Sequence, residues 1–329
     1  MAEKKKSTTE KKKKSYVNNI RIAGYLKDNS LEEIENSSGE KAIRGALVIA
    51  TDKFSSYKVQ FYVSQYNKDG DESADYSRMS ALLPENTCTV ASFLKNNPGA
   101  TNEDAFAAAT PVWVMGRLEE YATRKGERED SMILFKGNRG GVASTDKGPF
   151  TPAATFEADI FINSMEPEVD EDNTETGRLL VEGLLVKYDG SCDKIDFIAV
   201  EEDDVAKFIK SNWRVGDTVN ISGDLVSLQE RILIESSAEE RFGRSSGPQY
   251  ETHFIRERRI TGGSKSPRRT EEDGAISTDT VKAGLVKREE RMQRNGERSS
   301  QRSKETSQES NFGKTAKAEK SSGSEDFEF

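Results

Sequence analysis

The chain has 329 residues, of which 33% are hydrophobic and 33% are charged, and its net charge is −9. This average is too polar for one compact body, so part of the chain is expected to be disordered. The negative balance argues against a protein that is basic throughout, such as a histone-like packing protein.

The scarce residue types exclude several classes of site. Cys88 and Cys192 lie far apart in the sequence and give neither a disulfide framework nor a zinc spacing. The single histidine, His253, excludes most catalytic triads and histidine-based metal sites. The sequence has no phosphate-binding loop or dinucleotide fingerprint, and no apolar run is long enough to span a bilayer. We therefore expect a cytoplasmic protein that is not an enzyme and binds no cofactor.

The chain begins with a Lys-rich stretch, residues 1–16, which is predicted to be a disordered basic arm. After it, apolar and polar residues alternate with period two, as is typical of half-buried β-strands. A partly helical stretch, broken by Pro84, separates three early strands from the later ones. This order indicates a five-stranded Greek-key barrel of the oligonucleotide-binding (OB) type over residues 17–168. The strands are expected at residues 20–26, 43–49, 57–66, 112–118 and 156–162, with a further strand-like stretch at residues 132–136.

The same pattern recurs in a shorter form after an acidic linker at residues 169–177. Residues 219–225 match residues 112–118 position by position in their apolar residues and their glycine. We therefore predict a second, reduced OB-like barrel over residues 178–262. The predicted fold is mainly β, with two OB-like five-stranded Greek-key barrels in tandem.

Aromatic and basic residues occupy the predicted outward positions of the first barrel. Aromatic rings can stack on unpaired bases while Lys and Arg follow the phosphates, although each residue taken singly fits an ordinary solvated surface equally well. The matching outward positions of the second barrel are Asn220, Ser222 and Asp224, so we expect a supporting or protein-docking role there. The predicted nucleic-acid-binding residues are Arg21, Tyr25, Arg44, Lys58, Tyr62, Trp113, Arg117, Tyr121, Arg124 and Lys136.

Residues 263–329 are rich in Gly, Ser, Lys, Arg and Glu and are predicted to be a long disordered tail, with room for a short helix at 281–294. Their acidic, Phe-ended tip resembles the tail of bacterial and bacteriophage single-stranded DNA-binding proteins. Those families place OB barrels ahead of a disordered linker and recruit replication and repair proteins through the tip. The resemblance implies partner-binding roles for Asp326, Phe327, Glu328 and Phe329, with the last ring in an apolar pocket of the partner.

The tip departs from the common bacterial form because it lacks the usual proline before the final phenylalanine. This departure favours a phage protein that acts in the host cytoplasm. The predicted function is binding of single-stranded DNA in replication or recombination, where the protein would coat and protect exposed strands and recruit partners. Two alternatives remain: an adaptor whose barrels bind protein, and a magnesium-dependent nuclease. The oligomeric state and the choice between DNA and RNA stay open.

Overall fold

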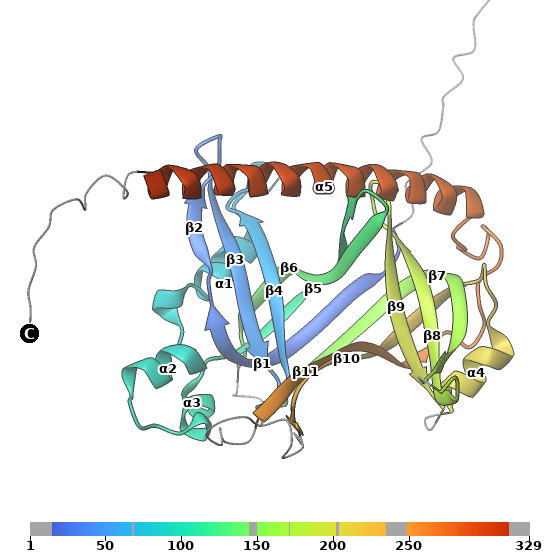
Figure 1. The fold of residues 1–329 in the computed structure, drawn as a ribbon, viewed down its shortest axis with the longest axis horizontal. Coiled ribbons are helices and arrows are strands. Elements are labelled where there is room, and N and C mark those ends of the chain that lie inside the picture. The colour runs from blue at the N-terminus through green and yellow to red at the C-terminus, as the bar shows by residue number, and fades with distance from the viewer. Residues whose placement is uncertain are drawn as a thin grey trace, which may run out of the picture.

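The computed structural model describes residues 15–67, 69–144, 150–170, 172–201, 204–234 and 249–315. Within these ranges the chain is mainly β, and eleven strands pair into one sheet that closes on itself twice (Figure 1). The sheet therefore contains two closed five-stranded rings, and the one remaining strand pairs with an edge of the first ring.

The first ring runs in the order β1, β3, β4, β6, β5 and back to β1, and all its pairings are antiparallel except β4 with β6. Short helices connect its third and fourth strands, and β2 pairs with the edge of β3. The elements are β1 (Asn18–Asn29), β2 (Glu32–Glu35), β3 (Lys41–Ala50), β4 (Ser56–Ser64), α1 (Ala74–Ser80), the 3-10 turn η1 (Pro84–Asn86), α2 (Val90–Asn96), α3 (Asn102–Ala108), β5 (Pro111–Lys125) and β6 (Arg128–Val142).

The second ring repeats this order as β7, β8, β9, β11, β10 and back to β7, and β9 with β11 is again its parallel pairing. It has five strands of its own and is reduced only in the connection, where α4 stands in place of the several helices of the first ring. The elements are β7 (Ala153–Val169), β8 (Glu175–Val186), β9 (Cys192–Val200), α4 (Val205–Asn212), β10 (Thr218–Ile234) and β11 (Gln249–Gly263).

The internal match seen in the sequence has a structural basis in two glycines. Gly116 of β5 and Gly223 of β10 each follow a β-bulge, and a Cβ at either position would collide with a carbonyl oxygen of the neighbouring strand. The two backbones therefore approach too closely for any other residue at the same place in both rings. The predicted alternation of core-facing and outward-facing residues in β5 also holds, because Val112, Val114 and Leu118 are fully buried.

The two rings share one hydrophobic core. β7 pairs with β1 of the first ring as well as with β8 and β10 of the second. The buried phenol of Tyr57 donates a hydrogen bond of 2.6 Å to the carbonyl oxygen of Leu225, and a single cluster of buried apolar side chains extends through both rings. The strand expected at residues 156–162 is thus present, but it opens the second ring rather than closing the first. The stretch expected to be an acidic linker forms the turn between β7 and β8 and the adjoining strand ends.

The prediction of a disordered tail after residue 262 is wrong for residues 278–315, which form the helix α5 (Thr278–Thr315). The helix packs on β5 of the first ring and on β8 and β9 of the second, and it crosses both rings in Figure 1. Its buried face has helical spacing, but it consists of glycines and an arginine as well as apolar residues, so the composition hid it. These buried residues are Val281, Gly284, Arg288, Met292 and Gly296.

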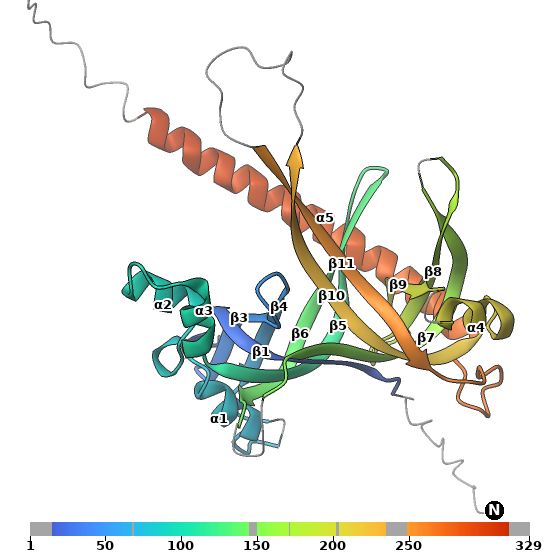
Figure 2. The ribbon, with the colours of Figure 1, turned by 90° about the horizontal axis from the view of Figure 1, so that it is seen from below.

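Three long hairpins project to the same side of the molecule: β5 with β6, β7 with β8, and β10 with β11 (Figure 2). The basic arm, apart from residues 15 and 16, and the acidic tip lie outside the described residues. No helix within the described ranges is both long and apolar enough to cross a membrane.

Candidate nucleic-acid interface

The outward sides of β3, β4, β5 and β6 border a groove of about 920 Å³, which we call the first-ring groove. Basic and aromatic side chains line much of it, and five of the ten residues predicted to bind nucleic acid are among them. Those five are Arg44, Lys58, Tyr62, Arg117 and Lys136.

The strand register brings these side chains together. Arg44 lies opposite Tyr62 in the antiparallel pair of β3 and β4. Lys136 lies beside Gln60 in the parallel pair of β4 and β6, and opposite Arg117 in the pair of β5 and β6. Opposed residues on one face of a sheet have their Cβ atoms about 5 Å apart. Residues from four strands therefore form one continuous surface.

Most cations of the groove have weak local partners. Arg44 pairs with Glu32 at 2.7 Å, and Arg117 donates to Asn138 at 2.9 Å. The Nζ of Lys136 donates to the amide oxygen of Gln60 at 2.6 Å. Exposed contacts of this kind contribute little to stability, so a phosphate group can replace them at small cost. The side chain of Lys58 is exposed and makes no hydrogen bond or ion pair within the described part of the chain.

Two tyrosines present their rings to the groove. Tyr62 is 56% exposed and Tyr66 is 44% exposed, and both line the groove. The alternation of β4 explains the first, because Phe61 and Val63 on either side of Tyr62 point into the core. A partly exposed ring beside cations suits stacking against a flat ligand.

The acidic residues of the groove are neutralised by neighbours. Glu119 pairs with Arg117 at 3.3 Å, and Asp75 pairs with Arg78 at 3.0 Å. These pairs leave the surface with cations that can exchange partners and with few carboxylates that lack a counter-ion.

Three of the other predicted residues lie elsewhere on the first ring. Tyr25 packs edge-on against Phe106 and Phe150, where the connecting helices cover β1, with ring centroids 6.4 Å and 5.4 Å away. Trp113 is half-buried beside Gly141, its partner on β6. Arg21 borders a smaller cleft of about 430 Å³ between the two rings, which also contains acidic residues. The structure therefore does not place all ten predicted residues on one surface.

Tyr121 and Arg124 lie on the β5–β6 hairpin beyond the groove. Tyr121 is exposed, but it does not line the groove. Arg124 is engaged by carboxylates, because it pairs with Glu289 of α5 at 2.5 Å and with Glu129 at 3.2 Å. This contact could not be foreseen without α5, and it gives Arg124 a structural role.

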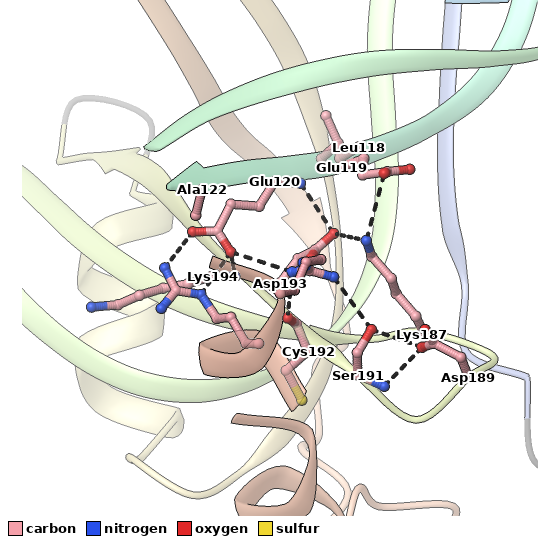
Figure 3. A network of polar contacts seen from close by, with 12 residues as sticks. Leu118, Glu119, Glu120, Ala122, Lys187, Asp189, Ser191, Cys192, Asp193 and Lys194 are labelled. Atoms are coloured by element: carbon pink, nitrogen blue, oxygen red, sulfur yellow. Dashed lines mark hydrogen bonds and ion pairs between the residues drawn. The ribbon is translucent and has the colours of Figure 1, made fainter. Parts of the chain in front are cut away.

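The base of the same hairpin is fixed by a buried network of charges that the sequence analysis missed (Figure 3). Arg288 of α5 donates two hydrogen bonds to Glu120, of 2.7 Å and 2.5 Å. Asp193 at the start of β9 accepts from the backbone of Glu120 at 3.0 Å and pairs with Lys187 at 2.9 Å and with Arg291 at 2.5 Å. The network joins the first ring, the second ring and α5.

The two kinds of carboxyl in this region titrate in opposite directions. Burial raises the pKa of Asp193 above its ordinary value, although Lys187 and Arg291 act against that shift. The hydrogen bond from Arg288 lowers the pKa of the less buried Glu129. Because both carboxyls pair with arginines of α5, their protonation would weaken the ion pairs that attach the helix to the rings.

The second ring uses its polar side chains differently. Asn220 donates to the carboxylate of Asp159 at 3.1 Å, and Lys194 pairs with Glu182 at 2.5 Å. Asp224, at the position that matches Arg117, is exposed and acidic. At the positions that match Trp113 and Arg117 of the first ring, the second ring therefore carries Asn220 and Asp224.

The family model of YorF matches residues 16–298, which include both rings and all the residues of α5 that are described as buried. The chain belongs to the YorF family. A comparison of this YorF-family chain with curated proteins gives no match.

Among solved structures, the YorF-family chain is similar to the wild-type single-stranded DNA binding protein from Thermus aquaticus, with 12% identity and a TM-score of 0.40. That match covers 77% of this chain and 94% of the other. A deletion mutant of the Thermus protein matches with 11% identity and a TM-score of 0.38, covering 76% of this chain and 94% of the other. At this level of similarity, function has to be argued from the geometry of the groove.

Proposed function

We propose that the first-ring groove binds single-stranded nucleic acid, with single-stranded DNA as the expected ligand. The observation that carries the proposal is the convergence of Arg44, Lys58, Arg117 and Lys136 with the exposed ring of Tyr62 in one groove. Cations follow a phosphate backbone, and an aromatic ring stacks on a base only where that base is unpaired. This combination therefore favours a single strand over a duplex.

Both rings are further proposed to be barrels of the OB type. The support is their strand order of first, second, third, fifth and fourth, with one parallel pairing and a helix between the third and fourth strands. In barrels of this type the second and third strands form the face that binds oligonucleotides. Those strands are β3 and β4 in the first ring, and they carry Arg44, Lys58 and Tyr62.

A role in replication or recombination, as part of a phage system, is the corresponding biological proposal. The protein would coat exposed strands, protect them and recruit other proteins. The residues proposed for recruitment are those of the acidic tip, Asp326, Phe327, Glu328 and Phe329, whose pattern supports this role through the resemblance given above.

The test is a titration of labelled single-stranded DNA, duplex DNA and single-stranded RNA, followed by fluorescence anisotropy. Tyr62→Ala is expected to weaken binding of single strands by about 5- to 150-fold, because stacking contributes about 1–3 kcal/mol per base. Tyr121→Ala is the matched control, since this tyrosine is also exposed but lies outside the groove. Its effect is expected to be less than about threefold, as for a surface substitution away from the ligand.

The proposal fails if the protein does not bind single strands, if it binds duplex equally well, or if the two tyrosine variants lose the same affinity. Binding of single strands that survives Tyr62→Ala and Lys58→Ala together would show that the groove is not the binding site. Absence of any nucleic-acid binding would favour the adaptor alternative, in which the barrels bind protein. The nuclease alternative gains no support, because no three His, Cys, Asp or Glu side chains group into a metal site among the residues described.

A further inference from the structure

The loop between β3 and β4 holds an aromatic ring in solvent. One carboxylate oxygen of Asp52 accepts hydrogen bonds from the backbone N–H groups of Phe54, at 2.7 Å, and of Ser55, at 2.8 Å. Ser55 is buried, whereas the side chain of Phe54 is 61% exposed. The loop is thus closed by its own side chain in a conformation that leaves the Phe54 ring available for contact.

The β10–β11 hairpin of the second ring presents another exposed ring directly beside this loop. The backbone N–H of Gln229 donates to the carbonyl oxygen of Phe54 at 3.2 Å, and Gln229 is the cross-strand partner of Phe254. The Phe254 side chain is 62% exposed. The guanidinium carbon of Arg256 lies 5.7 Å from the centre of the Phe254 ring, within the range of a cation–π contact.

This region is continuous with the first-ring groove. The hydroxyl of Ser227, the cross-strand partner of Arg256, donates to the carbonyl oxygen of Ser56 at 2.9 Å. Ser56 is two residues from Lys58 on β4, which lines the groove. Lys58 is therefore the groove residue nearest to this contact along β4.

We infer that a bound single strand continues from the groove past Lys58 onto a second contact area made of Phe54, Phe254 and Arg256, which we call the hairpin patch. The inference rests on the proposed function of the groove. Two separate exposed rings, a guanidinium and a lysine along the path match a ligand of alternating flat bases and phosphates.

The hairpin patch gives the second ring a part in binding that its own β8 and β9 do not offer. Tyr62 lies six residues along β4 from Ser56, which corresponds to about 20 Å of extended strand, and the loop that carries Phe54 lies beyond Ser56. A short oligonucleotide can therefore fill the groove without reaching the patch, whereas a longer one engages both.

The experiment compares Phe54→Ala combined with Phe254→Ala against the unchanged full chain, using labelled oligonucleotides of about 5 and about 16 nucleotides, near the two ends of the site sizes of such barrels. The double variant is expected to bind the long oligonucleotide at least about tenfold more weakly and the short one with unchanged affinity. Tyr62→Ala should weaken both. Phe208→Ala, a partly exposed phenylalanine on α4 of the second ring, is the matched control and should weaken neither.

A second measurement guards against loss of folding in the double variant. In Phe254→Trp, the new indole emission should be quenched by the long oligonucleotide and not by the short one. Unchanged affinity of the double variant for the long oligonucleotide overturns the hairpin patch and leaves the groove intact. An equal loss for both lengths also overturns it, because the patch would then belong to the short site. If the unchanged chain binds neither oligonucleotide, the proposed function itself fails.

Discussion

The salt dependence of binding is the sharpest prediction for the groove. Four cations line it, and each phosphate contact with a single strand contributes about −0.7 to the slope of log K against log salt concentration, so a slope of about −2.8 is expected for the groove alone. Lys58→Ala should change this slope to about −2.1, because this lysine has no competing partner among the described residues.

One substitution near the groove is expected to raise the affinity for a single strand instead of lowering it. Glu32 pairs with Arg44 at 2.7 Å, and both side chains are more than half exposed. Glu32→Gln removes a carboxylate that competes with phosphate for Arg44, so affinity should rise by a few-fold, about 1 kcal/mol or less for an exposed pair.

Both variants are measured by anisotropy with an oligonucleotide of about 5 nucleotides, at salt concentrations between about 0.05 and 0.2 M, where electrostatic binding changes steeply. Lys207→Ala removes an exposed cation that pairs with Asp204 at 3.2 Å, away from the groove, and it is the control for a general change of charge. The reasoning is refuted if Lys58→Ala leaves the slope unchanged, or if Lys207→Ala changes it by the same amount.

Three further predictions concern the attachment of α5. Arg288→Met should lower the free energy of unfolding by about 3–5 kcal/mol, because it leaves the buried carboxylate of Glu120 without its main counter-ion. Arg78→Met, at an exposed ion pair, should lower it by less than about 1 kcal/mol. Equal losses of stability in a denaturant titration would contradict this prediction. Gly284→Ala should destabilise the protein by about 1–3 kcal/mol although alanine favours helices, because a Cβ at this position would collide with the buried Sγ of Cys192. A gain in stability would show that the helix is not docked as described. Arg288 holds the pKa of Glu129 below its ordinary value of 4.5. The stability lost in Glu129→Gln should therefore be constant above about pH 6 and should shrink as the pH falls below 4.5 through the lowered pKa. A loss of stability that grows in acid would contradict this direction of the pKa shift.

The strands were predictable because their side chains alternate cleanly between core and solvent. The match between residues 112–118 and 219–225 even anticipated the two glycines that permit close approach of neighbouring strands, Gly116 and Gly223. The groove was predictable where outward positions of adjacent strands coincide in register, as for Arg44 and Tyr62.

Residues whose surroundings come from distant segments were not predictable. Trp113 alternates correctly, but the sequence does not reveal that it lies beside Gly141. The role of Arg124 depends on α5, which has no continuous apolar stripe. Its docking relies on glycines and on Arg288, whose partners Glu120 and Glu129 lie more than 150 residues away in the sequence.

The length of α5 has a consequence for whatever follows it. The last residue of α5 that is described as buried is Gly296, and the helix continues to Thr315 for another 19 residues, or about 28 Å at 1.5 Å per residue. Figure 2 shows this part of the helix extending away from the rings. On the proposed function, this helical extension lies in the sequence between the rings and the residues proposed to recruit a partner, so binding a strand and recruiting a partner need not compete for space.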